Sequence, residues 1–179
     1  SFNPTQFGYY SGGSDPGTVT IVDRIDYSND TATASPRGPL SGGRNYFSGT
    51  GNSFFGYLAA SQGSISSVER IDYDNDTATA SPKGPLSENK QSFGATGNTD
   101  FGYFGGGQGP KSTVDRIDYS NDTATALARG PLSVARNELA ATGNSSFGYF
   151  AGGYIGGQSV VDRIDYSNDT ATASPKGPL

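Results

Sequence analysis

The sequence predicts an all-β fold, a β-propeller built from four repeated units of four antiparallel strands each. The main observation is a sequence segment, VDRIDYSNDTATASP, of which three further, nearly identical copies occur in the 179 residues. Each of the four copies contains an Asp-Tyr pair. The Asp residues of these pairs are Asp26, Asp72, Asp118 and Asp165, at spacings of 46, 46 and 47 residues. A period of this size is typical of propellers and solenoids. A second observation is that no segment shows an amphipathic helical period, so we expect no helix.

The repeats divide the chain into one domain of four units. A Gly-Pro-Leu triplet lies 12 residues after each of these Asp residues, and length varies only between an FGY triplet and the VDR or VER triplet that follows it. Insertions are tolerated in exposed loops. The predicted units are 1–40, 41–86, 87–132 and 133–179.

Each unit contains four short runs that favour strands. In the last unit these are RNELAAT, FGYF, VDRIDY and TATAS, which are rich in aromatic, β-branched and Thr residues. The YSND and ATGNS segments between them read as hairpin turns, because Asn and Asp adopt left-handed angles and bond their own backbone. Four antiparallel strands per unit indicate propeller blades, which are stabilised by their neighbours.

These residues resemble the kelch repeat. Arg44 and Arg136 match that family's Arg before the first strand. A Tyr followed by paired Gly is found in the first, third and fourth units, and the second unit has Ala60 and Ser61 in place of the pair. The family's Trp falls on Ala in every unit. Residues at these matched positions are Tyr9, Gly12, Gly13, Tyr103, Gly106, Gly107, Tyr149, Gly152, Gly153, Ala32, Ala78, Ala124 and Ala171. The nearly identical repeat sequences are also similar to the repeat arrays in marine bacteriophage structural proteins.

Composition excludes several classes of site. The chain has no Cys and no His, which removes thiolate chemistry, the commonest metal ligand and the commonest general base. A net charge of −5 argues against nucleic-acid binding. No apolar run is long enough for a membrane span. We therefore expect no enzyme activity and no cofactor. Because the sequence has no Met, we also expect a processed chain or an excerpt of a longer one.

Three local patterns have a plain and a sharper interpretation. Asp72, Asp74 and Asp76 alternate as in part of a calcium loop, yet the distal Gly and Glu of that loop are missing, which favours a turn. The N-D-T sequons fit glycosylation as well as turn chemistry; they begin at Asn29, Asn75, Asn121 and Asn168. The Gly-rich segment 104–112 reads as a loop between strands, since no helix-opening phosphate motif follows it.

The variable segments suggest where function lies. In an up-and-down blade the turns after strands one and three share one face, and these are nearly constant. The connections after strands two and four share the other face and differ between copies, and loops on a rigid scaffold are where recognition residues usually lie. The candidate binding residues on this variable face are Tyr10, Asp15, Arg44, Gln62, Gln108, Lys111, Arg136, Tyr154 and Gln158.

The predicted function is a non-catalytic extracellular or virion-associated module that binds a glycan or protein on a host surface. The alternative is a purely structural component of a particle or fibre, with other virion proteins or further copies of the chain as partners. We also expect the first blade to lack its innermost strand, because residues 1–5 contain Pro4 and make a poor substitute.

Overall fold

The structure is a computed structural model that describes residues 6–63, 65–154 and 159–179. It confirms the all-β class and the four units, each of which forms one antiparallel sheet. The first sheet contains β1 (Phe7–Ser11), β2 (Val22–Asp26) and β3 (Ser35–Pro36). The second contains β4 (Ser48–Gly51), β5 (Phe55–Ala59), β6 (Val68–Asp72) and β7 (Ser81–Lys83). The third contains β8 (Gly94–Gly97), β9 (Phe101–Gly105), β10 (Val114–Asp118) and β11 (Leu127–Arg129). The fourth contains β12 (Ala140–Gly143), β13 (Phe147–Ala151), β14 (Val161–Asp165) and β15 (Ser174–Pro175).

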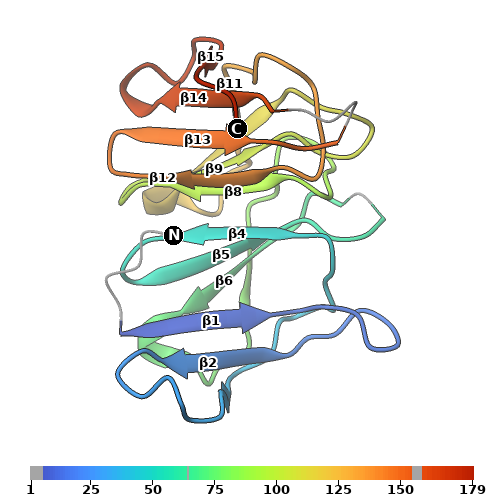
Figure 1. Ribbon diagram of the computed structural model, residues 1–179. Coiled ribbons are helices and arrows are strands. Elements are labelled where there is room, and N and C mark those ends of the chain that lie inside the picture. The colour runs from blue at the N-terminus through green and yellow to red at the C-terminus, as the bar shows by residue number, and fades with distance from the viewer. Residues whose placement is uncertain (1–5, 64, 155–158) are drawn as a thin grey trace.

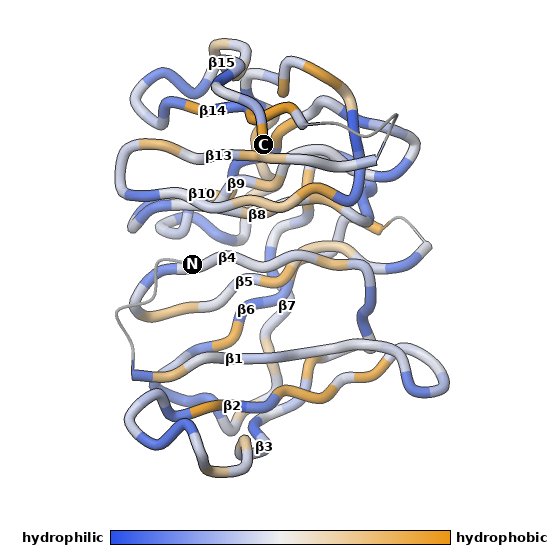
Figure 2. The backbone as a smooth tube through the Cα atoms, in the orientation of Figure 1, coloured by the Kyte–Doolittle hydropathy of each residue, from blue (hydrophilic) through white to orange (hydrophobic). Residues whose placement is uncertain are grey.

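The four sheets follow one another in chain order like successive blades. Figure 1 shows the first sheet at the bottom and the fourth at the top, so these two lie at opposite ends of the molecule. The innermost strands β4, β8 and β12 are neighbours in that order. In Figure 2 the hydrophobic stretches are short and occur in all four sheets, as expected when every sheet buries surface against the next.

The turn after the third strand differs from the predicted hairpin. In three blades it begins with a single turn of 3-10 helix, namely η1 (Tyr73–Asn75), η2 (Tyr119–Asn121) and η3 (Tyr166–Asn168). The expectation of no helix was therefore wrong at these positions. The Asp before each turn accepts a hydrogen bond from the backbone two residues on, as in Ser120 N to Asp118 Oδ1 at 2.9 Å. This local bond competes with a continued strand ladder.

The fourth strand of each blade also begins later than predicted. The TATA residues belong to the turn, and the strand starts only at the following segment, as in β11. The TATA segment instead docks against the preceding blade: Ala126 N donates to Pro85 O at 2.8 Å, and Gly84 N donates to Asp122 O at 2.9 Å. A side chain on Gly84 would overlap the carbonyl group of Ala124. The Gly of the Gly-Pro-Leu triplet therefore permits a close backbone approach between blades.

Apolar side chains fill each of the three junctions between neighbouring blades. At the middle junction Tyr57 and Val68 of the second blade meet Phe104, Ile117 and Tyr119 of the third. The rings of Tyr57 and Tyr119 stack with centroids 4.6 Å apart. Equivalent stacks join Tyr9 to Tyr73 and Tyr103 to Tyr166. The repeated aromatic residues are therefore core residues at these junctions.

A buried carboxylate completes each junction. Asp122 of the third blade accepts hydrogen bonds from Tyr57 Oη at 2.9 Å and Arg70 Nη1 at 2.7 Å, both of the second blade. Lys83 Nζ lies 3.3 Å from the other carboxylate oxygen. Burial and the bond to Asp122 raise the pKa of the Tyr57 phenol. Asp76 and Asp169 receive the same three kinds of donor from the blades before them. We call this arrangement the junction acid.

The paired Gly residues have positive φ. Gly106 has a φ of 82° and Gly107 of 140°, and the pairs of the first and fourth blades are similar. In the second blade Ala60 takes the left-handed angle, with a φ of 64°, and Ser61 does not. The second blade therefore accepts left-handed strain at Ala60, of about 1 to 2 kcal/mol, and bends differently at the next residue.

The first blade has three strands within the described residues. The prediction that residues 1–5 do not supply the innermost strand concerns residues outside the described ranges. In the other blades the innermost strand pairs with its second strand, as β8 pairs with β9.

Candidate functional site

The constant and variable faces of the blades are held by different kinds of hydrogen bond. On the constant face, the Asn of each TGN turn binds its own backbone: Asn98 Oδ1 accepts hydrogen bonds from the backbone N–H groups of Asp100 and Phe101, both at 2.9 Å. Asn52 and Asn144 repeat these bonds. The constancy of this face is therefore explained by turn chemistry.

The sequons and the alternating Asp residues also lie on turns. All four sequon Asn side chains are exposed, in agreement with their place in the 3-10 turns or, at Asn29, in the corresponding turn of the first blade. Asp76 is not free to bind calcium, since it is the junction acid paired with Arg24 at 2.8 Å. Across the described ranges, no group of three or more acidic side chains gathers as a metal site would require.

Two predicted binding residues are buried instead. Arg44 and Arg136 are 3% and 0% exposed, so the expectation that they recognise a ligand is corrected. Arg136 Nη1 lies 2.8 Å from Asp162 Oδ2 inside the fourth blade, and Arg44 Nη2 lies 2.9 Å from Glu69 Oε1 inside the second. A long basic side chain threads into the blade and anchors the loop that precedes its innermost strand.

The third blade has Lys90 at this position, a residue that the sequence reading did not single out. Its Nζ lies 3.3 Å from Asp115 Oδ2 and donates to Thr113 O at 2.8 Å. Burial lowers the pKa of Lys90, while Asp115 and Glu88 oppose that shift. The signal was available in the sequence: a basic residue recurs at 44, 90 and 136, always 25 or 26 residues before an acid, although the letters around it change.

Beyond the buried anchors, the loops of the variable face are joined to one another by backbone hydrogen bonds. Ser92 N donates to Tyr46 O, and Glu138 N donates to Ser92 O, both at 2.8 Å. These three residues have φ values of 52°, 55° and 56°, which residues other than Gly rarely adopt. Such strain persists only where the surroundings impose it, and it clusters at functional sites.

We call Tyr46, Ser92 and Glu138 the loop row. The φ angle is nearly the same at all three positions, so the loops hold three different side chains on a similar backbone. Tyr46 is 61% exposed. At the other end Tyr154, 67% exposed, donates its backbone N–H to Asn137 O at 2.7 Å, next to Glu138. Two exposed Tyr side chains therefore belong to a rigid network that spans three blades.

The other predicted residues of this face have mixed positions. Gln62 and Gln108 are exposed, and Gln62 binds Asn45 Nδ2 through its side-chain oxygen at 2.9 Å. Asp15 is exposed in the loop after β1. Lys111 is half-buried and pairs with Glu88 at 2.6 Å, which holds the pKa of that carboxyl below its usual range against the opposing effect of burial. Gln158 lies outside the described residues.

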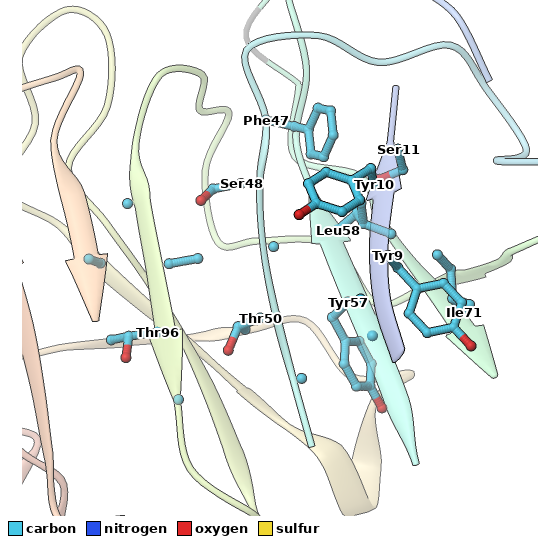
Figure 3. Close-up of a pocket in the computed structure, with 18 of the residues that line it drawn as sticks. Tyr9, Tyr10, Ser11, Phe47, Ser48, Thr50, Tyr57, Leu58, Ile71 and Thr96 are labelled. Atoms are coloured by element: carbon cyan, nitrogen blue, oxygen red, sulfur yellow. The ribbon is translucent and has the colours of Figure 1, made fainter. Parts of the chain in front are cut away.

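Tyr10 lies on β1 and not on a loop. It lines a groove of about 590 Å³ that runs along the innermost strands, shown in Figure 3. Tyr10 and Phe47 lie at one end of the groove, and Thr50 and Thr96 lie further along it. Because Phe47 directly follows Tyr46, that end adjoins the loop row. The groove is open because the innermost strands consist of Gly, Ala, Ser and Thr, and no charged residue is found among the described residues that line it.

Comparison with known proteins adds no identity to this geometry. None of the known protein-family models matches the chain, and no curated protein is similar to it in sequence. Within the described part of the chain, no helix is long and apolar enough to cross a membrane.

Proposed function

We propose that this protein is a non-catalytic binding module of an extracellular particle such as a virion, and that its variable face recognises a glycan on a host surface. The observation that carries the proposal is the loop row, where one strained backbone geometry presents Tyr, Ser and Glu in successive blades. A fold that only needed to close its loops would place Gly at these angles. Side chains held at such cost are suited to recognition.

The chemistry of the variable face favours a sugar as the ligand. Exposed Tyr46 and Tyr154 offer flat aromatic faces with a polar tip, and Gln62 and Gln108 offer amides that can both donate and accept hydrogen bonds. Of the three cations among the predicted residues, Arg44 and Arg136 are buried and Lys111 is paired with Glu88. A sugar with few charges fits this surface better than a strongly anionic ligand does.

A catalytic role has less support. The groove lining contains no titratable carboxylate or amine among the described residues, so it does not offer the pair of acids that glycoside hydrolysis requires. The buried acids are already engaged: Glu69, Asp115 and Asp162 hold buried cations, and the junction acids hold neighbouring blades. Binding without turnover is the simpler assignment.

The test is a glycan array with three variants. We expect Tyr46→Ala and Tyr154→Ala each to weaken binding of the sugars that the chain captures by roughly tenfold, since a lost aromatic contact costs about 0.5 to 1.5 kcal/mol besides its buried area. Phe54→Ala is the matched control, because Phe54 is an equally exposed aromatic residue, at 60%, in a turn of the constant face. A blank array, or equal loss with Phe54→Ala, would refute the glycan proposal.

The alternative, a structural component of a particle or fibre, is supported by a different observation. The first and fourth sheets lie at opposite ends of the molecule, and their junction groups Asp30 and Leu179 are exposed in the described part of the chain. This role is compatible with glycan recognition, because the end surfaces and the loop row involve different residues.

A further inference from the structure

The three junctions inside the molecule are copies of one interface. In each, the earlier blade supplies a Tyr hydroxyl, an Arg and a second basic side chain, and the later blade supplies the junction acid and a Tyr ring for stacking. The same contacts recur from Tyr9 and Arg24 to Asp76, and from Tyr103 and Arg116 to Asp169, with hydrogen bonds of 2.8 to 2.9 Å. The molecule thus contains three examples of the same complementary pair of surfaces, one from the earlier blade and one from the later blade.

The fourth blade carries the donor half of a further junction. We call its groups the tail surface: Tyr149, Val161, Arg163, Lys176 and Leu179. The Arg163 guanidinium lies 4.2 Å from the Phe147 ring centroid, just as that of Arg116 lies 4.2 Å from Phe101. Arg163 is therefore already held in the orientation of an engaged donor, although no acid faces it among the described residues. Leu179 is 77% exposed, whereas its counterparts at the internal junctions are 2% exposed; these are Leu40, Leu86 and Leu132.

The first blade carries the acceptor half. We call its groups the head surface: Tyr10, Ile25, Tyr27, Asp30 and Ala34. Asp30 occupies the position of the junction acid but is exposed, whereas Asp76 and Asp122 are 8% and 7% exposed. Tyr27 is 57% exposed, and Tyr10, the counterpart of buried Leu58 and Phe104, is 60% exposed. These are the largest apolar groups that the first blade leaves in solvent at this end.

We infer that the tail surface of one molecule binds the head surface of a second copy of this chain. Tyr149 would stack on Tyr27 of the second copy, and the tail donors would contact its Asp30. Gly177, at which an added side chain would meet nothing within 4 Å, would approach the turn that contains Ala32, as Gly84 approaches Ala124. The occupant is a second copy because it is complementary to the tail in charge, in ring stacking and in backbone hydrogen bonding together.

The assembly follows from the kind of interface. Two different surfaces meet, so every molecule that has joined through its tail keeps its head available. Such head-to-tail contacts produce a ring when the rotation closes and a filament when it does not. The head and tail surfaces share no residue with the loop row, so self-association and ligand binding can be measured separately.

The experiment measures the mass of the chain in solution by sedimentation velocity over a concentration series. We expect species of about 37 kDa or more, at least twice the 18.5 kDa of one chain. Asp30→Lys disables the head, and Arg163→Glu with Lys176→Glu disables the tail. Each is expected to weaken association by at least about 30-fold, as is usual when one partner of a hydrogen-bonded charge pair is lost. Asp74→Lys is the matched control, since Asp74 is an exposed acid of the corresponding turn in the second blade.

Mixing the two disabled chains gives the sharper result. The head-disabled chain keeps an intact tail and the tail-disabled chain keeps an intact head, so an equimolar mixture should form a one-to-one dimer and nothing larger. Circular dichroism and thermal melting of each variant confirm that it is folded. A wild-type chain that stays monomeric at its solubility limit overturns the inference. So does a mixture that fails to associate, or an Asp30→Lys chain that associates as the wild type does.

Discussion

Removal of a junction acid should weaken the contact between two neighbouring blades and so lower the free energy of unfolding. Asp122 receives Tyr57 at 2.9 Å, Arg70 at 2.7 Å and Lys83 at 3.3 Å, and its side chain is 8% exposed. In an Asp122→Ala variant these three donors lose their acceptor, and two of them are cations. Breaking a buried ion pair from one side costs about 3 to 5 kcal/mol.

The expected magnitude is somewhat lower here. The Arg70 side chain is 23% exposed and can recover part of its hydration. We therefore expect Asp122→Ala to lower the free energy of unfolding by about 2 to 4 kcal/mol, and the melting temperature by roughly 6 to 12 °C for a domain of this size.

The assay is urea unfolding followed by circular dichroism, at a protein concentration low enough for the chain to be monomeric. Asp30→Ala provides the control, because Asp30 has the same sequence neighbours but is exposed and receives no junction donor from the described residues. Its effect should stay within about 0.5 kcal/mol of zero. If the two substitutions cost the same, the junction acid stabilises its own turn and not the contact between blades, and our reasoning is wrong.

Two further predictions concern the junctions. Gly84→Ala should destabilise the chain by about 3 kcal/mol or more because its methyl group would overlap the Ala124 carbonyl, whereas Gly177→Ala, with open space around it, should be neutral; urea midpoints of the two variants test this. Burial and a bond to an acid raise the pKa of Tyr9 to about 12, and burial raises that of Tyr166 to about 12, above the value near 10 of an unfolded chain. The folded state keeps these protons longer, so stability should be complete below about pH 10 and fall as the pH rises towards about 12; an unfolding midpoint that stays constant over this range would contradict the assignment.

Much of the fold could be predicted because the repeat itself reports the period. The strands with FGY and VDR sequences are found where their aromatic and β-branched residues predicted them. The fourth strand was misplaced because TATA has strand-forming Thr residues, whereas its backbone groups bind the preceding blade: Ala126 N donates to Pro85 O. A bond of that kind depends on tertiary contact, which local propensity does not contain.

The candidate site was harder to predict. The prediction that residues of the variable loops are exposed is wrong for Arg44 and Arg136, whose stems reach into the blade interior. The loop row was missed for the opposite reason. Tyr46, Ser92 and Glu138 have no residue type in common, and only backbone angles reveal that they are equivalent. Their regular spacing of 46 residues was the available signal.

Identical junctions have a consequence for how such a chain can change over generations. If residues 41–86 were deleted, Tyr9 and Arg24 of the first blade would face Asp122 in place of Asp76, with the same donors, the same acid and the same stacking ring. Recombination between the near-identical repeats can therefore add or remove whole units without damage to the scaffold. The second, third and fourth units each carry their own loop and their own buried anchor, so an exchange of one of these units brings a new member of the loop row into an unchanged frame.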